Sequence, residues 1–73
     1  MTREQRITAL MLGKCRFLPG SFDKRFARSM RDIALYKPAQ ELTEKQAECL
    51  VKMAGRYRRQ MAGVPIPTVE EVG

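Results

Sequence analysis

Three segments of the chain place apolar residues at helical spacing, and turn signals separate them. The clearest segment is 22–36, in which four apolar residues fall within about an 80° arc of a helical wheel. These four residues are Phe22, Phe26, Met30 and Ile33. Ser21 is a suitable N-cap, and Pro38 disfavours helical geometry at Lys37, so the helix is expected to end near Tyr36. The pattern predicts an amphipathic helix that buries its phenylalanines.

A shorter helix is expected over residues 3–12. Thr2 is its candidate N-cap, and Gln5 stands at the position that completes a capping box, in which two free backbone donors are satisfied reciprocally. Its apolar side consists of Ile7, Leu10 and Met11. Gly13 offers a left-handed end to this helix.

The third helix is predicted over residues 44–62, with Thr43 as N-cap and Gln46 completing a second capping box. Its inner face consists of Ala47, Leu50, Val51, Ala54, Tyr57 and Met61. Gly55 lowers helix propensity by about 1 kcal/mol relative to alanine, but the periodicity continues past it. Two prolines follow closely, so residues 64–73 are expected to form an extended or disordered tail.

These segments predict an all-α fold, a small three-helix bundle formed by residues 1–63. The second and third helices are expected to run antiparallel and to pack through Phe22, Phe26, Met30, Ile33, Leu50, Val51, Ala54 and Tyr57, with Ile7, Leu10 and Met11 closing the core. A chain of 73 residues buries only about 60% of its unfolded surface, which leaves one thin core. That core is compatible with a homodimer that buries Leu35 or Met53.

Residues that carry catalytic or metal chemistry are scarce. The chain has no histidine and two cysteines, Cys15 and Cys49, so one chain cannot assemble the usual four-ligand zinc set. Cys15 stands between Lys14 and Arg16, where neighbouring cations could lower the pKa of its thiol; the alternative is an incidental thiol without a base beside it. We expect no enzymatic activity, no cofactor and no bound metal.

Hydropathy predicts a cytoplasmic protein. No apolar run approaches the roughly 18 residues of a membrane span. The stretch Ile7–Leu12 is too brief for the apolar region of a signal peptide. Both cysteines are therefore expected to be reduced thiols, and no membrane partner is expected.

Charge carries the strongest functional signal. The net charge is +6, and residues 1–63 hold all fourteen cations but only six of the eight carboxylates, a net charge of +8. Helical spacing places seven of these cations on outward faces: Lys24, Arg28 and Arg31 on the second helix, and Lys45, Lys52, Arg56 and Arg59 on the third. Such faces predict binding of nucleic acid through phosphates, or alternatively of an acidic protein surface by a small regulator or inhibitor. The simplest alternative is that these cations only keep a small bundle soluble.

One stretch of the sequence also resembles a group of known proteins. Leu42-Thr43-Glu44-Lys45-Gln46, continuing to Tyr57-Arg58-Arg59-Gln60 and preceded by the 22–30 helix, is similar to small helical proteins encoded in phage and prophage-like regions of bacteria. The resemblance covers about 40 residues, from Phe22 to Met61. It implies an origin in a mobile element and an accessory role.

Overall fold

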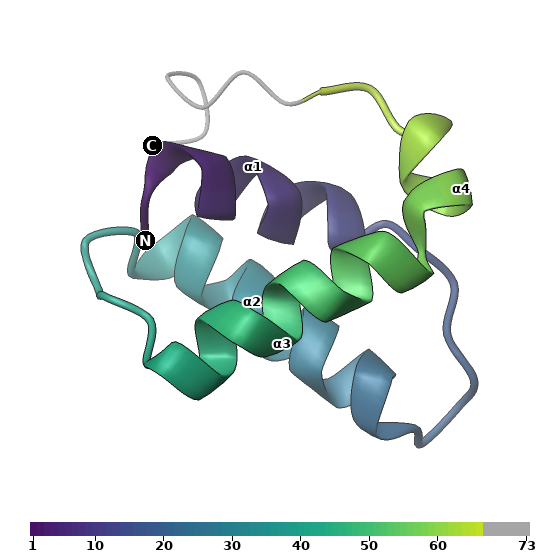
Figure 1. Ribbon diagram of the computed structural model, residues 1–73, viewed down its shortest axis with the longest axis horizontal. Helices are drawn as coiled ribbons and strands as arrows, with labels where there is room; N and C mark the ends of the chain where they lie inside the picture. The colour runs from purple at the N-terminus through teal and green to yellow at the C-terminus, as the bar shows by residue number, and fades with distance from the viewer. Residues whose placement is uncertain (67–73) are drawn as a thin grey trace.

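A computed structural model of the protein describes residues 1–66, and these residues form helices and no strand (Figure 1). The helices are α1 (Arg3–Leu12), α2 (Phe22–Tyr36), α3 (Glu44–Arg56) and α4 (Arg58–Ala62). The predicted all-α bundle is confirmed. Of the tail predicted for 64–73, the structure describes 64–66, which are not helical. The rest of that prediction lies outside the described residues.

Local side-chain chemistry sets the helix starts. The Thr2 hydroxyl accepts a hydrogen bond from the Gln5 backbone at 3.1 Å, and the Gln5 side chain accepts from the Thr2 backbone at 2.9 Å. Thr43 and Gln46 form the same reciprocal pair at 3.1 and 3.0 Å. The Ser21 hydroxyl accepts from the Lys24 backbone at 3.2 Å. The predicted caps are therefore confirmed, and each supplies partners for backbone N–H groups that the first helical turn leaves open.

The third helix is interrupted, which corrects the continuous helix predicted over 44–62. It ends at Arg56, and Tyr57 adopts φ −102° and ψ 18° before α4 begins at Arg58. Figure 1 shows α4 turning away from the axis of α3. Tertiary contacts explain the interruption, because the Tyr57 ring packs against Phe17 and its hydroxyl bonds to Asp23. The weak propensity of the neighbouring Gly55 makes the helix easier to bend there.

The core lies between α1, α2 and α3. Its buried apolar residues are Ala9, Leu10 and Leu12 of α1, Ala27, Met30 and Ala34 of α2, and Leu50 and Met53 of α3. Residues predicted for the core that are buried are Leu10, Met30 and Leu50. Helix α2 runs back alongside α1, its closest neighbour, and α3 crosses the pair (Figure 1). The closest helix pair is thus the first and second, whereas apolar periodicity predicted that the second and third would pack together.

The buried faces of α2 and α3 are rotated from the predicted ones. Phe22 is 60% exposed and Val51 is 72% exposed, although both were predicted to be core residues. Met53, assigned above to a surface that a partner could cover, is 1% exposed. On α2 the buried residues Ala27, Met30 and Ala34 lie within an arc of about 60° centred near Ala34, roughly 75° from the centre of the phenylalanine arc. Small alanine side chains let the backbone of α2 approach α1 closely, which the bulkier phenylalanine face would prevent.

Arg6 is buried between α1 and α2, a position that apolar periodicity did not select. Its Nε donates a 2.9 Å hydrogen bond to the carbonyl oxygen of Ala34. In a continuous helix that oxygen would accept from the N–H four residues later, but residue 38 is proline and has no N–H. Arg6 therefore supplies the donor that Pro38 lacks and joins α1 to the last turn of α2.

Candidate functional site

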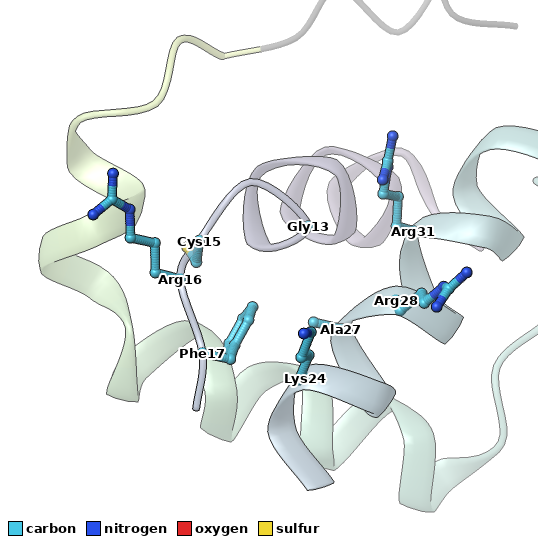
Figure 2. Close-up of a pocket in the computed structure, with 8 residues that line it drawn as sticks. All are labelled: Gly13, Cys15, Arg16, Phe17, Lys24, Ala27, Arg28 and Arg31. Atoms are coloured by element: carbon cyan, nitrogen blue, oxygen red, sulfur yellow. The ribbon is translucent and has the colours of Figure 1, made fainter. Parts of the chain in front are cut away.

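A groove runs between the segment 13–17 and one side of α2. It has a volume of about 540 Å³ and is lined by Gly13, Cys15, Arg16, Phe17, Lys24, Ala27, Arg28 and Arg31 (Figure 2). Four of the eight lining residues are cations and none is a carboxylate. We call this feature the cationic groove, and we call Arg16, Lys24, Arg28 and Arg31 the groove cations.

Helix α2 provides three of the groove cations. Lys24, Arg28 and Arg31 follow one another at helical spacing, so they project from one side of α2, next to Ala27 at the base of the groove. All three are exposed. Among residues 1–66 no hydrogen bond or ion pair engages their charged ends. The structure brings these three cations together on one outward side of α2, and their predicted role in binding stays a prediction.

Gly13 makes room for Arg31. A Cβ atom placed on Gly13 would lie 2.8 Å from Cδ of Arg31 and 3.2 Å from its Cβ and Cγ. The alkyl stem of Arg31 therefore packs directly over the end of α1. This contact sets the point on the surface from which the guanidinium extends into solvent. Gly13 has φ −61° and ψ −16°, so the left-handed helix end expected from the sequence is wrong. Its role is to provide space.

Helix α4 holds the opposite wall of the groove. The Gln60 side chain accepts a hydrogen bond from the Arg16 backbone N–H at 2.7 Å and donates one to the Arg16 carbonyl oxygen at 3.2 Å. The rings of Phe17 and Tyr57 meet edge to face, with centroids 4.7 Å apart and planes at 71°. These contacts fix the segment that carries Arg16 and Phe17.

Asp23, in the first turn of α2, holds Tyr57, the residue that packs against Phe17 in the same wall. Its Oδ2 accepts hydrogen bonds from the Tyr57 hydroxyl at 2.7 Å and from the Arg56 guanidinium at 2.9 Å. The Tyr57 hydrogen bond, together with the hydrogen bond and charge of Arg56, holds the pKa of Asp23 below its ordinary value. The same hydrogen bond, together with burial, raises the pKa of Tyr57. The Asp23 carboxylate therefore has a structural role, because it accepts hydrogen bonds from both Tyr57 and Arg56.

The other four predicted site residues do not line the cationic groove. Lys45, Lys52 and Arg56 lie on α3 and Arg59 lies on α4, and all four are exposed. Arg56 is engaged by the Asp23 carboxylate, so its charge is partly compensated within the fold. The seven predicted cations thus divide into the α2 group in the groove and a group on α3 and α4.

Arg16 is the one groove cation that helical spacing did not predict. It lies in a connector without hydrophobic periodicity, and the contact that positions it comes from Gln60, 44 residues later. The only local signal is a pair of cations, Lys14 and Arg16, just before the Pro19-Gly20 turn. Nothing in that signal indicates that Arg16 lines the same groove as the cations of α2.

Cys15 also lines the groove. Burial raises the pKa of its thiol, the opposite of the lowering that the neighbouring cations could have caused. Its Sγ lies 3.8 Å from the carbonyl oxygen of Met11, to which the thiol donates a weak hydrogen bond. Cys15 and Cys49 are both free thiols. The arrangement does not favour a nucleophilic role for Cys15.

Comparison with protein-family models, curated proteins and solved structures found no significant match for this chain. None of the helices in residues 1–66 has the length and apolar character needed to cross a bilayer. Within the same residues, no group of three or more metal-ligating side chains is placed to hold a metal ion. The geometry and charge of the cationic groove are therefore the features that indicate a function.

Proposed function

We propose that the protein binds nucleic acid through contacts between the groove cations and phosphate groups. The supporting observation is that four cations border one groove whose lining contains no carboxylate. Arginine presents a planar fork of donors that pairs bidentately with phosphate, and three of the four groove cations are arginines. In this proposal the protein is a non-enzymatic, cytoplasmic accessory factor, the role that the resemblance to phage-encoded proteins implies.

Contacts to phosphates predict weak sequence preference and strong dependence on salt. Phosphate groups are the same at every position of a strand, so they fix the protein on the nucleic acid without reading its sequence. Each contact releases condensed counterions, and the logarithm of affinity falls with the logarithm of salt by about 0.9 per phosphate on duplex DNA and about 0.7 on single strands. Four contacts would give a slope of about −3 to −4.

The decisive experiment is a salt titration of fluorescence anisotropy with labelled oligonucleotides. The groove variant carries Lys24→Gln and Arg28→Gln, and the matched control carries Lys45→Gln and Lys52→Gln on α3. Both variants lose the same charge, but only the first loses it from the groove. We expect the groove variant to bind more weakly and to reduce the slope by about two contacts, or roughly 1.5 to 2. The control should stay close to the unmodified protein.

Equal weakening by both variants would mean that attraction is spread over the whole surface, and the groove would lose its special role. Failure to bind any oligonucleotide at low salt would overturn nucleic-acid binding altogether. The acidic protein surface, the alternative partner for the same cations, would then be the next occupant to test. Circular dichroism of each variant establishes that the helices persist when the charges are removed.

A further inference from the structure

The cationic groove has an apolar interior and a charged rim. Gly13, Phe17 and Ala27 supply the interior, and the groove cations supply the rim. Figure 2 shows the side chains of Arg16 and Arg28 extending outward in opposite directions, away from the Phe17 ring. The groove volume of about 540 Å³ falls within the roughly 300–1,000 Å³ of typical small-molecule sites. A hollow of this kind suits a ligand with a flat apolar part and several negative charges.

We infer that the groove takes a single-stranded segment of nucleic acid, with one unpaired base against the ring of Phe17 and the flanking phosphates on the rim cations. This inference rests on the proposed function and narrows it. In a duplex the bases are stacked and paired, and the convex phosphate backbone has nothing to place in an apolar hollow. A single strand exposes the face of each base, and any base can stack on an aromatic ring between cations.

The placement of Phe17 supports this assignment. The ring is half-buried and held edge to face against Tyr57, and the backbone of its neighbour Arg16 is held by the two hydrogen bonds of Gln60. A ring fixed in this way loses little conformational freedom when a base stacks on it. Its neighbours on both sides of the groove are cations, Arg16 on the segment and Lys24 on α2.

The spacing of the α2 cations fits a strand that runs along the helix. Lys24 and Arg31 are seven residues apart, which is about 10 Å along the helix axis. That distance allows contacts to more than one phosphate of the same strand. Arg28 lies between them, so the cationic rim continues along the whole length of the groove.

The test compares three probes on the unaltered protein by fluorescence anisotropy: a single-stranded oligonucleotide, its duplex, and a single strand of equal length made of abasic nucleotides. The abasic strand keeps every phosphate and removes every base. We expect the ordinary single strand to bind more tightly than the duplex. Loss of the stacked base should weaken binding by between about 5-fold and 150-fold, the usual range for one stacked base, with an unchanged salt slope.

A pair of variants locates the effect. Phe17→Leu should lower affinity for the ordinary strand but not for the abasic strand, and Phe22→Leu, an exposed phenylalanine outside the groove lining, should change neither. Equal affinity for the ordinary and abasic strands, or tighter binding of the duplex, would overturn the inference while leaving phosphate binding intact. No binding of any probe would overturn the proposed function as well. The comparison of probes needs no variant, so it decides the matter even if Phe17→Leu destabilises the fold.

Discussion

The hydroxyl of Tyr57 donates a 2.7 Å hydrogen bond to Oδ2 of Asp23, across a separation of 34 residues. This contact joins the junction of α3 and α4 to the first turn of α2. The ring of the same tyrosine packs on Phe17, one of the residues that line the cationic groove. Tyr57 thus connects the start of α2, through Asp23, with the opposite wall of the groove, through Phe17.

Acid should destabilise the fold through Asp23. The hydrogen bond from Tyr57, with the hydrogen bond and charge of Arg56, lowers the pKa of Asp23 in the folded state. A carboxylate of this kind contributes stability above its unfolded pKa, and that contribution is lost as the pH falls through the folded pKa. Below about pH 4, Tm measured by circular dichroism should fall more steeply for the unaltered protein than for Asp23→Asn. Parallel profiles would show that Asp23 contributes nothing to acid sensitivity.

Alkali should destabilise the fold through Tyr57, the other partner in the hydrogen bond with Asp23. The hydrogen bond to Asp23 and burial raise the pKa of Tyr57 in the folded state. The associated stability is fully present below the unfolded pKa of about 10 and is lost as the pH rises through the folded pKa. Tyr57→Phe should therefore flatten the dependence of Tm on pH above about 10. Tyr36→Phe, at a site that is 77% exposed, is the control, and an equal flattening there would exclude a specific role for Tyr57.

Replacing Arg6 by methionine should destabilise the protein by about 1–3 kcal/mol, the usual cost of leaving a buried polar group without its partner. Methionine keeps an unbranched apolar stem but cannot donate to the carbonyl oxygen of Ala34, and Pro38 offers no N–H in its place. Urea denaturation measures the loss. Arg25→Met removes an exposed arginine from α2 and should stay within about 0.5 kcal/mol. Equal losses would mean that the Arg6 contact adds little stability.

Two neighbouring residues of α3 test which face of this helix is buried. Met53→Ala removes a fully buried side chain and should cost about 2–5 kcal/mol. Val51→Ala removes an exposed side chain and should change stability by less than about 0.5 kcal/mol. Both free energies of unfolding come from urea denaturation. The opposite order of losses would restore the face that apolar periodicity predicted.

Helix starts could be predicted because their chemistry is local. Thr2 with Gln5 and Thr43 with Gln46 carry their capping partners within one turn, so the sequence spacing contains the whole interaction. The buried faces could not be predicted in the same way. Ala27 gives little hydrophobic signal, yet its small size lets α2 approach α1, and this advantage exists only after the two helices meet.

The residues of the candidate site could likewise be predicted only where local helical spacing determines their position. The helical spacing of Lys24, Arg28 and Arg31 is sufficient to place them on one side of α2. The position of Arg16 depends on Gln60, and the partial neutralisation of Arg56 depends on Asp23, 33 residues away. These contacts need the tertiary fold, so charge counting along a helix overestimated the cations available on α3 and missed the one in the connector.

Two glycines should respond in opposite ways to substitution by alanine. A Cβ on Gly55 meets nothing within 4 Å, so Gly55→Ala should stabilise the protein by about 0.5–1 kcal/mol through better helix propensity. A Cβ on Gly13 meets the stem of Arg31 at 2.8 Å, so Gly13→Ala must displace that arginine, with an expected cost of about 1 kcal/mol or more. Urea denaturation measures both changes.

Because Arg31 borders the cationic groove, Gly13→Ala should also weaken oligonucleotide binding in anisotropy titrations, and Gly55→Ala should not. Unchanged stability and affinity in Gly13→Ala would show that the close packing of Arg31 over the end of α1 does not set its position.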